Sequence, residues 1–199
     1  GAASIPGNLN KYTGGNGTSF AVPIVTGAMA LMYEQYKKNR SGQNPSGALM
    51  KAIVCNTAED IGNPGPDYTY GFGRIDAKRA IEVIKNEQFY EDSLSHNEIK
   101  EDTISIPSGV KAVRVMLYWH DEAGSEAANK MLINDLNINL LSPDGTSYLP
   151  WILDPSPAGC TADAVRGVDT LNNIEQITID SPSAGDYVIR VAGDIVPFG

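Results

Sequence analysis

The hydrophobic repeat changes once along the chain, near residues 86–100, and this change constrains the fold more than any other feature. Before that point, the segments "GALMKAIVCNTA" and "RIDAKRAIEVIKN" carry apolar residues at helical spacing. In the second segment Ala77, Ala80, Ile81 and Ile84 fall on one helical face, so a helix is expected there. Beyond the polar stretch "NEQFYEDSLSHNEIKED" the apolar residues alternate with a period of two. We therefore expect a helical part followed by a strand-rich part.

The strand-rich part contains four segments with alternating or β-prone character. In "KAVRVMLYWHD" the residues Val113, Val115, Leu117 and Trp119 share one face. The segments "LINDLNINLLSPDG", "NIEQITID" and "GDYVIRVAG" predict further strands, and Asp144-Gly145 predicts a turn. Several short strands separated by turn signals are typical of a β-sandwich. We divide the 199 residues into a first domain at 1–88 and a sandwich domain at 89–199.

The composition excludes one class of partner and leaves the cysteines unassigned. The formal net charge is −9, which argues against nucleic acid, because phosphates require a basic binding face. The apolar run from Phe20 to Tyr33 is too short to span a bilayer, which takes about 20 residues. Cys55 lies in an apolar segment and is expected to be a buried free thiol. A disulfide between Cys55 and Cys160 remains the less favoured alternative.

The same apolar run predicts a helix that is hydrophobic on every side. Only Thr26 interrupts it between Phe20 and Tyr33, whereas a surface helix normally keeps one polar face. We expect this helix at the centre of a large core, with Ser19 at its N-terminal end. Pro23 removes an early helical hydrogen bond, so an irregular first turn is expected.

The segment "GTSFAVPIVTG" closely resembles the nucleophile motif of subtilisin-like serine proteases, G-T-S-x-A-x-P-x-x-x-G. The segment "YGFGRIDAKRAI" is similar to another stretch of that family. The strand-rich part resembles the jelly-roll, P-domain-like sandwich that follows the catalytic domain in one branch of subtilases. The resemblance implies an α/β fragment, the C-terminal helices of a subtilisin-like fold, followed by an all-β jelly-roll sandwich.

The resemblance also implies a function, a serine-type endopeptidase that hydrolyses peptides through an acyl-enzyme on Ser19. Its Asp, His and oxyanion Asn are expected upstream of this chain, and neither His96 nor His120 matches the family pattern. The parent protein would then be an active enzyme and this chain alone inactive. Two alternatives stay open. Ser19 could simply cap a core helix, and the chain could be a non-catalytic, secreted adhesion or stabilising module.

Several acidic and amide residues of the sandwich are candidate calcium ligands. Calcium takes six to eight oxygen ligands, and members of the resembling branch bind calcium in this domain. The alternative is that these residues belong to turns and to a solvated strand face. The candidates are Asp121, Asn134, Asp135, Asp169, Asn172, Asn173 and Glu175.

The expected partners follow from the same reasoning. They are a peptide or protein substrate and the upstream half of the catalytic domain. Without that half, the helix from Phe20 to Tyr33 would be exposed, so a homodimer through the helical segment is expected. The family's sandwich usually continues beyond "VPFG", so one sheet edge is expected to be open. By resemblance, the parent protein is expected to be secreted or in the cell envelope.

Overall fold

The computed structural model describes residues 2–5 and 8–197, which form two compact units. Unit 1 consists of Gly1–Ser46 and Ala77–Gln88, and unit 2 consists of Gly47–Asp76 and Phe89–Gly199. The division differs from a single boundary at residue 88, because residues 47–76 cluster with the strand-rich part. No helix in the described residues is long and apolar enough to cross a membrane.

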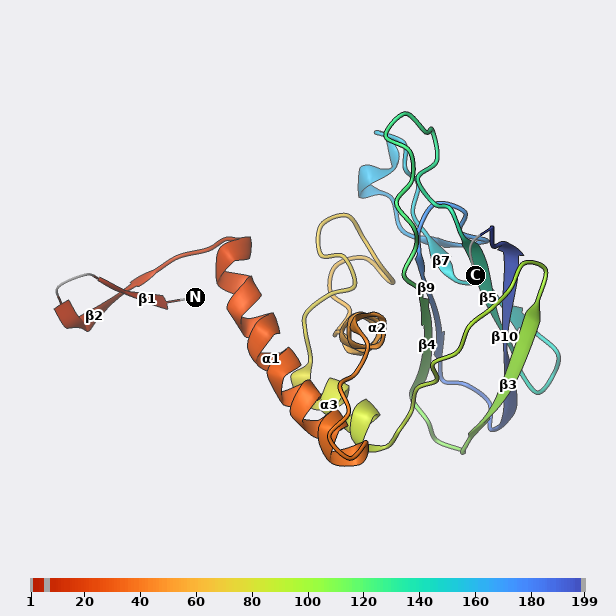
Figure 1. The fold of residues 1–199 in the computed structure, drawn as a ribbon, viewed down its shortest axis with the longest axis horizontal. Helices are drawn as coiled ribbons and strands as arrows, with labels where there is room; N and C mark the ends of the chain where they lie inside the picture. Colours follow the sequence, from red (N-terminus) through yellow and green to blue (C-terminus); the bar gives the residue numbers. More distant parts are fainter. Residues whose placement is uncertain (1, 6–7, 198–199) are drawn as a thin grey trace. The chain divides into compact units, whose positions relative to one another are not determined.

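Unit 1 contains a hairpin and two helices (Figure 1). Strands β1 (Ala2–Ile5) and β2 (Asn8–Gly14) pair antiparallel. Helix α1 (Thr18–Asn39) is followed in this unit by α3 (Ala77–Lys85). The side chain of Asn39 donates to the carbonyl of Ile84 at 2.9 Å and ties the two helices together.

The contact between α1 and α3 uses one face of each helix. The buried residues of α1 are Ala28, Met32 and Tyr36, spaced four apart, which places them on one side of the helix. On α3, Ala80 and Ile84 have no exposed surface. The helical spacing predicted for residues 77–84 is therefore confirmed.

Unit 2 contains helix α2 (Gly47–Thr57) and antiparallel strands in three sheets. The largest sheet has the order β3-β10-β5-β6, and two smaller ones pair β4 with β9 and β7 with β8. The strands are β3 (Ile99–Ile106), β4 (Ala112–Tyr118), β5 (Asp135–Leu141), β6 (Ser147–Tyr148), β7 (Trp151–Ile152), β8 (Val165–Arg166), β9 (Ile174–Asp180) and β10 (Gly185–Ile195), with a short 3-10 helix at Gly159–Thr161.

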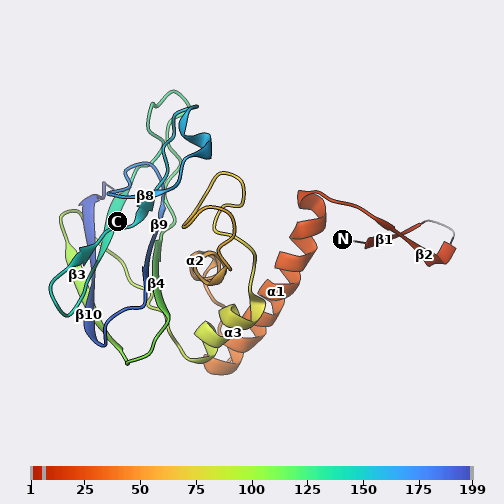
Figure 2. The same cartoon turned by 180° about the vertical axis from the view of Figure 1, so that it is seen from behind.

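The core of unit 2 lies between the β4-β9 pair and the larger sheet (Figure 2). Its buried members are Val113, Ile138, Leu140, Ile177, Ile179 and Tyr187. Strand β4 contributes the face that the sequence predicted, because Val115 and Leu117 pack against this cluster as well. The four predicted strands are thus confirmed, while the jelly-roll topology stays a prediction.

Helix α2 packs on the opposite face of the β4-β9 pair. The side chain of Asn56 donates to the carbonyl of Arg114 at 3.2 Å and accepts from Gln176 at 3.1 Å. The guanidinium of Arg114 donates to the carbonyl of Ala58 at 2.6 Å. These bonds fix α2 and the residue after it to both strands of the pair, β4 and β9. They explain why residues 47–76 belong to unit 2.

Both cysteines are free. Cys55 is partly rather than fully buried, and its burial raises the pKa of the thiol. Cys160 is exposed.

Candidate functional site

Ser19 is the second residue of α1 and is exposed at the N-terminal end of the helix. Gly17 occupies the N-cap position with a φ of 139°, a conformation that residues with a Cβ rarely adopt. No side-chain hydrogen bond caps the helix at that position. The alternative that Ser19 is the cap therefore does not describe this structure, since its hydroxyl lies inside the first turn.

The first turn of α1 presents backbone donors next to the Ser19 hydroxyl. The amide of Phe20 donates to the carbonyl of Gly17 at 3.0 Å, so the amides of Thr18 and Ser19 precede the first bond of the helix. Such amides, together with the positive end of the helix dipole, favour negative charge. The helix continues through Pro23, and its first bond, from Phe20 to Gly17, spans three residues instead of the four of a regular α-helix.

Much of α1 is exposed, as expected for this helix without the upstream half of the catalytic domain and unlike the buried position expected in the complete domain. Val22 and Ile24 are each 60% exposed and Leu31 is 52% exposed. A Cβ added at Gly27 would meet nothing within 4 Å, so no described element packs closely at this small residue. The physical reason is that, among the described residues of unit 1, only α3 makes an extensive contact with α1.

The histidines lie in unit 2. Unit 1, which contains Ser19, has no histidine. His96 lies in the turn before β3, where its Nδ1 accepts from the amide of Val196 at 3.4 Å. His120 follows the end of β4 rather than lying within a strand, and its ring contacts Tyr118 edge-on. Both histidines follow Ser19 in the sequence, whereas the family pattern has its base before the serine.

Five of the seven calcium candidates hold loops together. Asp121 accepts from the amides of Ile133 and Asn134, both at 2.8 Å. Asp169 accepts from the amides of Leu171 and Asn172 through one oxygen and from the Asn172 side chain through the other.

The two remaining amide candidates surround Trp119. The carbonyl of Asn134 accepts from the indole of Trp119 at 2.9 Å. The side chain of Asn173 donates to the Trp119 carbonyl at 2.8 Å. Together these bonds give the acidic and amide residues the turn-forming role that the sequence left open as an alternative.

Asp135 and Glu175 differ from the other five because each keeps a buried oxygen without a partner. Asp135 is 5% exposed, and one of its oxygens accepts from Lys130 at 2.8 Å. Glu175 is 1% exposed, and its Oε2 accepts from the amide of Ile138 at 2.8 Å. Asp135 Oδ1 and Glu175 Oε1 have no hydrogen-bond partner in the described chain.

Burial raises the pKa of Glu175 to about 8, against the smaller opposing effect of the Ile138 amide. The negative charges of Asp169, Asp135 and Asp194 raise it further. A buried carboxyl without a cation is most stable when protonated, since burial penalises the charged form. In residues 2–5 and 8–197 no three His, Cys, Asp or Glu side chains converge as a metal site.

Three polar residues near this cluster were not among the sequence candidates. The side-chain oxygens of Asn137 and Asn139 are buried without partners, and Asn137 donates to Asp194 at 2.8 Å. The alternation "DLNINL" already placed both asparagines on one strand face. Nothing in the sequence revealed that this face is closely covered, because that depends on contacts between distant segments.

Comparison with known proteins finds similarity to one protein family in the first part of the chain. Residues 4–73 match the sequence model of the Subtilase family. The serine protease/ABC transporter B family protein tagA of Dictyostelium discoideum is 26% identical over 197 residues, covering 89% of this chain and 11% of that protein.

Bacterial relatives match a smaller share of the chain. The autotransporter lipoprotein NalP of Neisseria meningitidis serogroup B is 40% identical over 65 residues, 33% of this chain and 6% of that protein. The extracellular serine protease of Serratia marcescens is 34% identical over 76 residues, 38% of this chain and 6% of that protein. The chain thus spans only a small part of the length of its relatives.

The raised pKa of Glu175 predicts that unit 2 loses stability as pH rises. The pKa of Glu175 in the folded state, about 8, lies above the ordinary value of 4.5. The protonated carboxyl therefore makes its full contribution to the free energy of unfolding below pH 4.5, and this contribution is lost as pH rises through 8. Glu175→Gln removes this dependence and raises the free energy of unfolding at about pH 8.5 by roughly 3–5 kcal/mol relative to the parent. Urea unfolding at about pH 5 and pH 8.5 measures the difference.

Glu126→Gln provides the matched control, because Glu126 is exposed and the same change there leaves the pH dependence intact. If the free energy of unfolding of the unsubstituted chain and of Glu175→Gln depended equally on pH, the raised pKa assigned to Glu175 would be contradicted.

Proposed function

We propose that the longer protein containing this chain is a serine endopeptidase that acts through Ser19, because residues 4–73 match the sequence model of the Subtilase family. The observation that supports this most directly is the position of Ser19. It is exposed in the first turn of a long helix, next to two backbone amides that precede the helical ladder. A helix cap, the common structural role of serine, is not its role here.

The proposed reaction divides the work between this chain and residues outside it. A histidine, oriented by an aspartate, takes the proton from the Ser19 hydroxyl, and the oxygen attacks the scissile carbonyl. The amide of Ser19 and an asparagine side chain donate to the resulting oxyanion. Collapse of this intermediate, in which the histidine gives its proton to the leaving amine, leaves an acyl-enzyme, which water hydrolyses. The aspartate, histidine and asparagine belong to the upstream half of the catalytic domain.

The competing function is a non-catalytic adhesion or stabilising module that kept the helix as a packing element. The exposed apolar residues of α1 fit either function, because both require a surface to cover them. The two differ in reactivity at Ser19. We further propose that the protein is secreted or part of the cell envelope and acts on peptides or proteins.

A fluorophosphonate probe is expected to label Ser19 in the longer protein and not in the 199-residue chain. The reason is that a serine hydroxyl reacts only when a base and oxyanion donors are positioned around it. The rates are expected to differ by more than about a thousandfold. Mass spectrometry of labelled peptides measures both.

Ser19→Ala is expected to abolish labelling of the longer protein, and Ser41→Ala, at an exposed serine, to leave it unchanged. Labelling of the short chain at the rate of the long one would show that these residues contain their own base. An unlabelled long protein would favour the non-catalytic module.

We also propose that the sandwich binds calcium through some of its oxygen-bearing residues. The supporting observation is that Asp135 and Glu175 keep buried oxygens without partners, while Asn137 provides a third such oxygen nearby in β5. Calcium would supply a positive charge beside Glu175, in addition to that of Lys130, which pairs with Asp135. The remaining candidates, which already bind backbone amides, would support the loops around it.

Millimolar calcium is expected to raise the melting temperature by mass action on the folded state. Asp135→Asn and Glu175→Gln are expected to remove most of that rise. Asp163→Asn is the control, because Asp163 is exposed and is not a candidate ligand. Scanning calorimetry with calcium, magnesium or a chelator measures the shift, and an unchanged melting temperature would leave these residues as structural groups.

In the absence of the upstream half, we propose that α1 associates with a second copy of the chain. Leu31→Lys is expected to shift the chain toward monomer, because a charge would be buried at that contact. Leu171→Lys, at a leucine 49% exposed in unit 2, is the matched control. Light scattering across a concentration range measures the molecular mass. A parent chain that remains monomeric at every concentration would contradict this proposal.

A further inference from the structure

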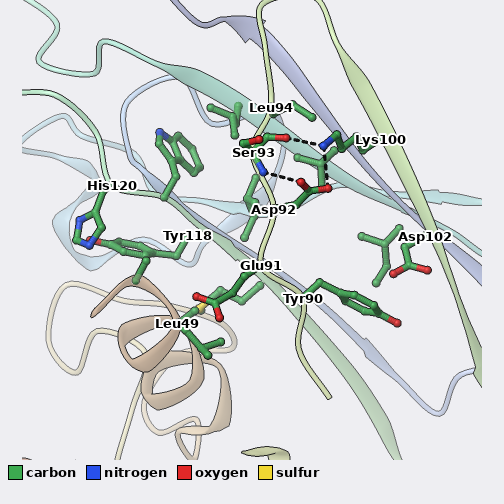
Figure 3. A pocket seen from close by; sticks show the side chains of 18 of the residues that line it. Leu49, Tyr90, Glu91, Asp92, Ser93, Leu94, Lys100, Asp102, Tyr118 and His120 are labelled. Atoms are coloured by element: carbon green, nitrogen blue, oxygen red, sulfur yellow. Dashed lines mark hydrogen bonds and ion pairs between the residues drawn. The ribbon is translucent and has the colours of Figure 1, made fainter. Parts of the chain in front are cut away.

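A groove of about 710 Å³ follows the edge of β4 in unit 2. This volume is in the range of ligand-binding pockets, about 300–1,000 Å³. Figure 3 shows Leu49 of α2 on one side of the groove and Lys100 and Asp102 of β3 on the other. Residues 90–94 cross between them and form no strand in the structure.

The edge of β4 in this groove has backbone groups directed away from its only strand partner in the described chain, β9. The backbone amide of Trp119 donates to the carbonyl of Asn173, and the amide of Ser181 donates to the carbonyl of Lys111. The backbone N–H and C=O groups of the odd-numbered residues of β4 therefore point toward β9. Backbone bonding alternates along antiparallel strands. The N–H and C=O groups of Met116 and Tyr118 therefore point toward the groove side.

The groove has an apolar wall on each side of this edge. The inner wall belongs to the sandwich core and consists of Leu117, Leu136, Ile189 and Val191. The outer wall belongs to α2 and consists of Ala48, Leu49 and Ala52. An added strand directs successive side chains to opposite faces, so alternate residues would contact one wall and then the other.

The charge of the lining is acidic. It includes the carboxylates of Glu91, Asp92 and Asp102 and the ammonium group of Lys100. Glu101 lies on the opposite face of β3, where it pairs with Arg190. Lys100 is paired with Asp92 at 2.8 Å. Asp102 lies on the same strand face as Ile104, which packs against the core, so it points to the groove side. This arrangement favours a basic group.

We propose that this groove binds an extended peptide by strand addition to β4. The peptide has apolar side chains facing the core wall and a basic side chain near Asp102. Its backbone bonds to Met116 and Tyr118 supply affinity, and the two walls and the acidic rim supply selectivity. The proposal does not depend on catalysis at Ser19.

The probe is an acetylated and amidated peptide of about eight residues in which valine alternates with lysine and threonine. Titration calorimetry with the 199-residue chain is expected to show binding. A peptide with glutamate in place of lysine is expected to bind at least about tenfold more weakly. A peptide of the same composition with its valines contiguous, and one with N-methylated amides, are also expected to bind more weakly, since neither can pair along a strand.

Hydrogen exchange gives the specific readout of the binding mode. At saturation the amides of Met116 and Tyr118 are expected to exchange at least about tenfold more slowly, as hydrogen-bonded amides do. Binding without this protection would overturn the proposal.

Two variants locate the site on the chain. Ala52→Leu narrows the outer wall and is expected to weaken binding, whereas Ala162→Leu, at an exposed residue outside the groove, is not. Asp102→Asn is expected to reduce the preference for the lysine peptide, and Asp163→Asn to leave it unchanged. Because the peptide variants test the same contacts, the result does not depend on how Ala52→Leu folds.

Other occupants of the groove would appear as distinct results. A dimer that forms through the β4 edge and is not dissociated by the peptide would overturn the proposal. So would a longer form of the polypeptide that leaves Met116 and Tyr118 protected and binds no peptide, because its own residues would then fill the groove.

Discussion

The burial of one face of the β4-β9 pair against the larger sheet determines most of what is chemically unusual in this protein. Along β9, Glu175 shares its face with Ile177 and Ile179, because strand side chains alternate with a period of two. Once the two isoleucines enter the core, the carboxyl of Glu175 must enter with them. Its bond to the amide of Ile138 crosses from one sheet to the other. The hydrophobic core thus creates the buried acid.

The same pair of strands has its second face covered by α2, so β4 lies between two apolar layers. A strand in that position can have neither face solvated, and only its edge remains accessible. At this edge the backbone N–H and C=O groups point outward, with apolar side chains on both sides of them. Exposed strand edges of this kind readily pair with other chains. The groove is therefore a consequence of how α2 and the sandwich enclose β4.

In helix α1 only part of the apolar surface is covered. Its buried residues lie on the face toward α3, while apolar residues such as Ile24 and Leu31 remain exposed. Under the proposed function, these residues are where the upstream half or a second copy of the chain would pack. The N-terminal end, with Ser19, nevertheless keeps its helical geometry, because local hydrogen bonds and the conformation of Gly17 define the first turn without help from distant elements.

The sequence by itself determined the elements and the nucleophile candidate. Helical spacing identified α2 and α3, alternation identified β4, β5, β9 and β10, and the "GTSFAVPIVTG" pattern identified Ser19. These features depend on residues close together in the chain, where periodicity and local geometry act. The tertiary structure decided the rest. It separated the loop-forming Asp121 and Asp169 from the unpartnered Asp135 and Glu175, assigned α2 to the strand-rich unit, and opened the groove beside Met116. Each depends on which distant segments meet, and local patterns contain no information on that.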